Sequence, residues 1–148
     1  MKADLTFYLD GLVEELVQIL TSQESPLQLN QKVGESYFFS SRNSILDGDF
    51  FYSKISIDKH EQPRHIPIQT ALQVQPQIYL MYSGCNVNKE KMSEFRKIME
   101  YFVSQKIAFY LLATDETGET ILVKGCNPRT GAEVDNPNFE QRVLDLLE

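Results

Sequence analysis

One short segment of the chain carries residue types that could do chemistry. It is the loop 83–88, with the sequence Ser-Gly-Cys-Asn-Val-Asn, and it lies between an apolar run typical of a strand and a stretch with helical periodicity. A cysteine just before a helix meets free backbone N–H groups and the positive end of the helix dipole. Both attract anions and lower the pKa of a thiol. The segment therefore predicts a crevice for a small molecule or an anion.

Catalysis by Cys85 is not the expected role of this loop. Cysteine-dependent phosphatases use such an arrangement, but they need an arginine six positions after the cysteine, where this chain has Lys91. The loop also contains Val87 and lacks a second glycine. An enzyme is therefore only the alternative. Its candidate ligand-binding residues are Ser83, Gly84, Cys85, Asn86 and Asn88, with Arg64 and His65 nearby.

The sequence predicts no metal site and no cofactor. His60 and His65 are five residues apart with Pro63 between them, and proline prevents the helix on which two imidazoles could share a metal. Cys85 and Cys126 lack the spacing of metal ligands. We expect no disulfide between the two cysteines, because the predicted strand order puts them at opposite borders of the sheet.

Charge and hydropathy argue against two classes of partner. The 14 basic and 21 acidic residues give a net charge of −7 at pH 7, which repels nucleic acids. No run of the sequence approaches the roughly 18 apolar residues of a membrane span, and the N-terminal segment does not have the pattern of a secretory signal. With two cysteines, too few for a disulfide framework, a cytoplasmic protein is expected.

The loop is positioned by a predicted β-α-β crossover over residues 77–113. Two apolar runs flank a helix over 88–106 whose apolar residues recur every three or four positions. A helix that joins two strands implies that the strands are parallel, so Ser83 and Thr114 should be neighbours at one border of the sheet. The residues of the helix that should face inward are Met92, Phe95, Met99, Phe102 and Val103.

The rest of the chain completes a single α+β domain over 1–148. Apolar periodicity and turn residues predict a helix over 4–22, strands over 35–41 and 49–57, and a helix over 137–147. The segment 58–76, which contains three prolines, is compatible with a helix, an edge strand or a loop. We expect a mixed, mostly antiparallel sheet of about five strands with helices over at least one face.

The predicted N-terminal helix carries the surface on which the leading function hypothesis depends. Its apolar residues fall on one stripe, which could serve either the core or a dimer seam. The candidate partner interface consists of Leu5, Tyr8, Leu9, Leu12 and Leu16.

The predicted element order, the small size and the acidity are similar to those of class I secretion chaperones. These are small dimeric proteins that hold partner segments across their sheet and helix surfaces, so the resemblance implies a protein partner and a homodimer. Nine Phe and seven Tyr agree with such a role, because aromatic side chains are favoured at contact surfaces. We expect a non-enzymatic, adaptor or chaperone-like protein-binding module and leave homodimerisation open. A small-molecule or anion-binding protein, or an enzyme, is the alternative.

Overall fold

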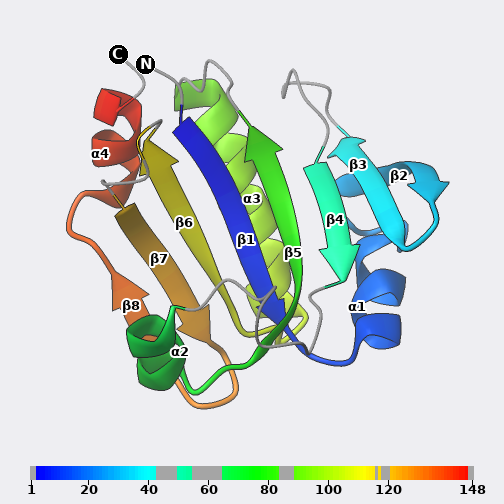
Figure 1. Cartoon of the computed structure of the whole chain (residues 1–148), viewed down its shortest axis with the longest axis horizontal. Helices are drawn as coiled ribbons and strands as arrows, with labels where there is room; N and C mark the ends of the chain where they lie inside the picture. The colour runs from blue at the N-terminus through cyan, green and yellow to red at the C-terminus, as the bar shows by residue number, and fades with distance from the viewer. Residues whose placement is uncertain are drawn as a thin grey trace.

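The computed structural model describes residues 3–42, 50–54, 65–83, 89–115, 117 and 121–146. In this part of the chain eight strands form one sheet in the order β2-β3-β4-β5-β1-β6-β7-β8, and every pair is antiparallel (Figure 1). The elements in chain order are β1 (Ala3–Asp10), α1 (Val13–Leu20), β2 (Leu27–Val33), β3 (Ser36–Ser41), β4 (Phe50–Lys54), α2 (Ile66–Leu72), β5 (Pro76–Ser83), α3 (Lys89–Ser104), β6 (Phe109–Asp115), β7 (Ile121–Asn127), β8 (Ala132–Asp135) and α4 (Phe139–Leu146).

The α+β class, the mostly antiparallel sheet and most of the elements agree with the sequence. The helices predicted over 88–106 and 137–147 are α3 and α4, and the strands predicted over 35–41 and 49–57 are β3 and β4, which pair antiparallel. The segment 58–76 contributes the short helix α2, which has a proline in its first turn, although its residues 58–64 lie outside the described part. The number of strands exceeds the expected five by β1, β2 and β8. β1 and β2 come from segments without an obvious strand signal, and β8 is only four residues long.

The predicted helix over 4–22 is wrong for residues 4–10, which form the strand β1. Leu5, Phe7 and Leu9 alternate along this strand, point to the same face and are at most 1% exposed. Their period of two competes with the helical spacing of the leucines over the same stretch. Gly11, whose φ of +145° disfavours other residues, separates β1 from α1, and only α1 keeps the predicted helical conformation.

The crossover β5-α3-β6 passes over β1, which lies between the two parallel strands. Ser83 on β5 pairs with Asp4 on β1, and Asp4 pairs in turn with Thr114 on β6. The ends of β5 and β6 therefore share one border of the sheet, as expected, but they are one strand apart and not adjacent. β1 takes the central position because it is buried on both faces, with Phe7 on one side and Tyr8 on the other.

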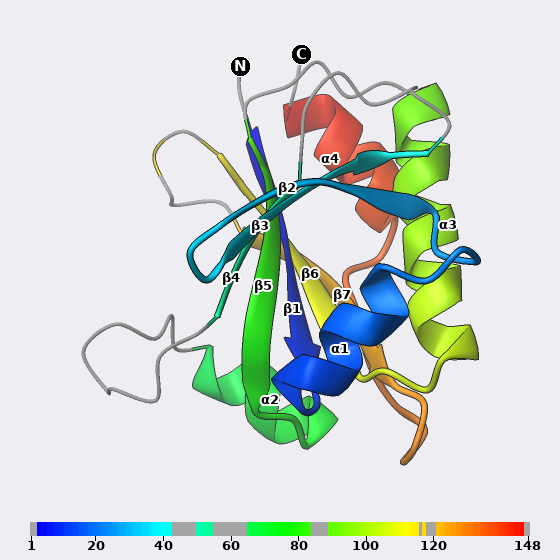
Figure 2. The same cartoon turned by 90° about the vertical axis from the view of Figure 1, so that its right-hand side faces the viewer.

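The helices are unequally divided between the two faces of the sheet. α1, α3 and α4 cover one face, called the helical face below, while α2 covers one end of the other (Figure 2). The larger core lies under the helical face. There the ring of Phe7 packs edge-on against that of Phe102, with 5.4 Å between the ring centroids. α2 packs against β7 and β8 from the opposite side. No helix among the described residues is long and apolar enough to cross a membrane.

Candidate functional site

Most of the predicted ligand-binding loop lies outside the described residues. Ser83 ends β5, whereas His65, at the start of α2, contacts Tyr8 and Tyr110. Tyr8 pairs with Tyr110 on β6 and with Tyr79 on β5, and Tyr79 is four residues, or roughly 13 Å, along β5 from Ser83. The structure therefore does not bring His65 to Ser83. The predicted site residues that are not described are Gly84, Cys85, Asn86, Asn88 and Arg64.

His65 belongs instead to an aromatic cluster that joins α2 to the sheet. Its Nδ1 lies 3.4 Å from the hydroxyl of Tyr110, to which the amide of Gln69 donates at 3.1 Å. The rings of Tyr8 and Tyr110 stack with their centroids 4.9 Å apart. Burial raises the pKa of both tyrosines to about 12 and lowers the pKa of His65. At pH 7 the cluster is therefore neutral and acts as packing for α2.

The five residues of the candidate N-terminal interface do not share one surface. Leu5 and Leu9 are 1% and 0% exposed on the helical face of β1, and Tyr8 is buried on the opposite face. Leu16 on α1 is 2% exposed, whereas Leu12 is 64% exposed. The stripe does not form because residues 4–10 of the predicted helix belong to the strand β1. Only Leu12 reaches the surface.

A groove on the helical face runs between α3 and the strands β7 and β8. Two adjoining hollows of about 480 and 450 Å³ form it, and both are lined by Arg96, Lys124 and Asp135. The first hollow lies beneath α4, and the second lies beside β8. We call this feature the α3–β8 groove and define it by Arg96, Val103, Lys124, Cys126, Glu133 and Asp135.

Helical spacing places the residues that α3 contributes to the groove. Arg96, Met99, Glu100 and Val103 follow one another at intervals of three, one and three, so they lie along one side of the helix. Phe102 is fully buried, but Val103 is 45% exposed, which corrects its prediction as an inward residue. Successive residues are about 100° apart around a helix, so the core-facing side ends between these two positions.

Strand alternation places the residues on the other side of the groove. Cys126 pairs with Glu133 and Lys124 pairs with Asp135 across β7 and β8, so all four side chains point to the helical face. Glu133 and Asp135 are exposed, while Cys126 and Lys124 are half-buried. The strands thus supply an acidic outer rim and a less polar floor.

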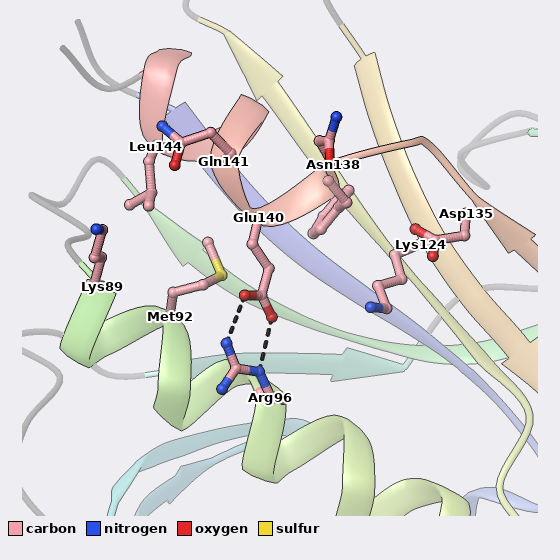
Figure 3. Close-up of a pocket in the computed structure, with 10 residues that line it drawn as sticks. Lys89, Met92, Arg96, Lys124, Asp135, Asn138, Glu140, Gln141 and Leu144 are labelled. Atoms are coloured by element: carbon pink, nitrogen blue, oxygen red, sulfur yellow. Dashed lines mark hydrogen bonds and ion pairs between the residues drawn. The ribbon is translucent and has the colours of Figure 1, made fainter.

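An ion pair between Arg96 and Glu140 connects α3 to α4 at one end of the groove (Figure 3). Arg96 Nε donates to Glu140 Oε1 at 2.9 Å, and Nη2 donates to Oε2 at 2.5 Å. These hydrogen bonds raise the pKa of Arg96 and lower that of Glu140. Lys124 reaches into the same hollow from β7, and its charge lowers the pKa of Glu140 further.

Cys126 is a free thiol in the groove, and its surroundings do not activate it. Burial raises the pKa of the thiol, Glu133 adds to the rise, and Lys124 opposes it. A thiol with a raised pKa is protonated at pH 7 and is a poor nucleophile. Within the described ranges no group of three or more His, Cys, Asp or Glu side chains is arranged to hold a metal ion.

No protein-family model matches this chain. Comparisons with curated proteins and with solved structures give no match either. The resemblance to class I secretion chaperones depended on an element order that begins with a helix, whereas the structure begins with β1. The α3–β8 groove was not predicted, because it forms only when α3 packs beside β6, β7, β8 and α4. The alternation of Lys124 with Cys126 and of Glu133 with Asp135 was the signal that could have indicated one face.

Proposed function

We propose that this protein is a binding module that engages a protein partner through the α3–β8 groove. The observation that carries the proposal is a groove with an apolar floor and a charged rim beside an edge strand of the sheet. Met99 and Phe109 form part of the floor, and Val103 is one of the large apolar side chains that remain exposed. Protein interfaces commonly combine an apolar centre with a polar rim.

The chemistry of the groove favours binding over catalysis. Arg96 and Glu140 are engaged with each other, and the raised pKa of Cys126 keeps its thiol protonated. The alternative, a small-molecule or anion-binding protein or an enzyme that uses the loop 83–88, depends on residues outside the described part. No described contact favours it over a binding module.

A cytoplasmic location is part of the proposal. Two cysteines in 148 residues, one of them the free Cys126, suit a reducing compartment. Leu5, Leu9 and Leu16 are buried in the core, so a dimer seam built from them is not part of the proposal.

A peptide library displayed on phage tests the proposed groove. The wild type is compared with Val103→Asn in the groove and with Val33→Asn on β2. The two valines are 45% and 55% exposed, so both variants should fold, which circular dichroism checks. We expect a family of peptides that binds the wild type and Val33→Asn but binds Val103→Asn at least about tenfold more weakly, because the new amide loses its hydrogen bonds to water when a peptide covers it. A library without peptides that distinguish the two variants would contradict the proposal.

A further inference from the structure

The backbone of β8 offers hydrogen-bonding groups along the free edge of the sheet. The amide of Asn136 donates to the carbonyl of Val123 at 3.0 Å, which fixes these two residues as a hydrogen-bonded pair. Such pairs alternate along antiparallel strands, so Val134 also faces β7. The N–H and C=O groups of Glu133 and Asp135 therefore point outward. No other strand of the described sheet pairs with this edge.

The side chains of the same two residues make this edge acidic. Glu133 and Asp135 are exposed on the rim of the groove, and Glu100 adds a third carboxylate from α3. The two cations that line the hollow beside β8 are Arg96, which is already bound to α4, and Lys124. No ion pair joins Glu133 or Asp135 to another described residue. The edge thus combines outward backbone hydrogen-bonding groups with the exposed carboxylates of Glu133 and Asp135.

We propose that the partner segment is an extended strand with basic side chains at alternate positions, and that it adds antiparallel to the free edge of β8. The chemistry of this partner rests on the proposed function of the groove. An added strand hydrogen-bonds to the outward backbone groups of Glu133 and Asp135, and its residues opposite them point to the helical face. Lysine or arginine at those positions lies directly across from a carboxylate, an arrangement that stabilises paired strands. The aliphatic stems of these side chains cover the apolar floor.

A second copy of this chain is a poor occupant of the same edge. Two β8 strands paired antiparallel would bring Glu133 of one copy against Asp135 of the other, and like charges across a ladder are destabilising. The other edge strand, β2, contains one basic residue, Lys32, whose Nζ lies 5.0 Å from the centre of the Tyr37 ring. The acidic rim therefore disfavours self-association and selects a basic strand.

The synthetic peptide TKVKVKT, with blocked termini, probes the charge requirement by fluorescence anisotropy. The double variant Glu133→Gln, Asp135→Asn is compared with Glu14→Gln, Glu15→Gln, which removes two exposed carboxylates from α1. We expect the β8 variant to bind about three- to tenfold more weakly and the α1 variant to match the wild type. The isomer TKKKVVT, with the same composition but without alternation, should also bind more weakly. Equal binding of TKVKVKT by all three proteins would overturn the charge requirement.

Backbone methylation of the peptide probes strand addition on the unaltered protein. The lysines opposite Glu133 and Asp135 must direct their amides toward β8, so N-methylation of the lysines should abolish binding and N-methylation of the valines should not. Equal effects of the two modifications would exclude an added antiparallel strand.

The phage selection separates failure of this inference from failure of the proposed function. Peptides that depend on Val103 but are insensitive to the double variant and to methylation would refute the basic strand and leave the groove as a binding site. If no peptide depends on Val103, the groove is not the binding site and both proposals fail.

Discussion

The two edges of the sheet differ in what lies beside them. In β2 every residue after Leu27 is exposed, its ladder with β3 is irregular at Asn30, and β2 and β3 cross the direction of the central strands steeply (Figure 2). In β8 half-buried and exposed residues alternate, with α2 on one face and the α3–β8 groove on the other. An edge exposed on both faces offers a partner little beyond backbone hydrogen bonds. The β8 edge adds an apolar floor and a charge pattern, which are what a selective interaction requires.

The largest difference between the two sides of the sheet is expected when a glycine near each edge is replaced by alanine. The two substitutions should lower the free energy of unfolding by different amounts. In Gly125→Ala on β7 the new Cβ would lie 2.6 Å from the carbonyl oxygen of Phe109 and from Cβ of Tyr110. Both residues belong to β6, so the ladder between β6 and β7 must shift. We expect the free energy of unfolding to fall by about 3 kcal/mol. Gly34, at a φ of +59° in the turn after β2, has open space around it, and Gly34→Ala should cost about 1–2 kcal/mol.

Urea denaturation of the two glycine variants measures this difference. Equal losses would mean that the β7–β8 side of the sheet is packed no more tightly than the β2–β3 turn.

Lowering the pH should destabilise the β8 side of the sheet before the β2 side, because α2 and the preceding His65 support only the β8 side. Burial lowers the pKa of His65 below its ordinary 6.5, so the unfolded chain takes up the proton more readily than the folded protein. The stability associated with the neutral ring is complete above pH 6.5 and is lost as the pH falls below that value. The urea midpoint should therefore fall between pH 7.5 and 5.5, and it should fall less in His65→Gln.

Amide exchange at the two pH values locates this effect. After correction for the intrinsic exchange rate at each pH, the protection of the amides should fall more on β8 than on β2 as the pH falls. An unchanged pH dependence in the His65→Gln variant would show that protonation of His65 does not destabilise this side.

The smallest effect is expected at the Arg96–Glu140 pair, which lies close to the surface. Because the pKa of Glu140 is lowered from its ordinary 4.5, its contribution is present above that value and is lost as the pH falls through the folded-state pKa. Glu140→Gln should lower the melting temperature at pH 7 by no more than roughly 3 °C, and this difference should shrink as the pH falls below 4.5. A larger loss at pH 7, or one that does not shrink below pH 4.5, would assign Glu140 a role beyond the ion pair.

The sequence predicted the elements whose apolar pattern has one interpretation. α3 and α4 combine helical spacing with buried residues such as Phe95 and Val143, and the hairpin β3–β4 is rich in aromatic residues. The segment that forms β1 fits both a helical period and the period of two of a strand. Tertiary packing buries both of its faces and thereby favours the strand. β2 carries no apolar pattern because nearly all of its side chains are exposed.

The candidate site was less accessible to sequence reasoning than the fold. A cysteine before a helix is a local signal, whereas the α3–β8 groove depends on how a helix, two strands and a second helix pack. Val103 illustrates the limit, because its place next to Phe102 in an apolar run gives no sign that it is exposed. The acidic pair of β8 acquires significance only once Glu133 and Asp135 are known to lie on an edge strand.

Amide hydrogen exchange on β8, with and without a bound peptide, tests most directly whether this edge receives a partner strand. In the free protein the amide of Val134, which faces β7, should exchange slowly, and the amides of Glu133 and Asp135 should exchange rapidly. Saturation with TKVKVKT should slow exchange at Glu133 and Asp135 and leave β2 unchanged. Slowing on β2 alone, or at neither edge while the peptide is bound, would contradict strand addition at β8.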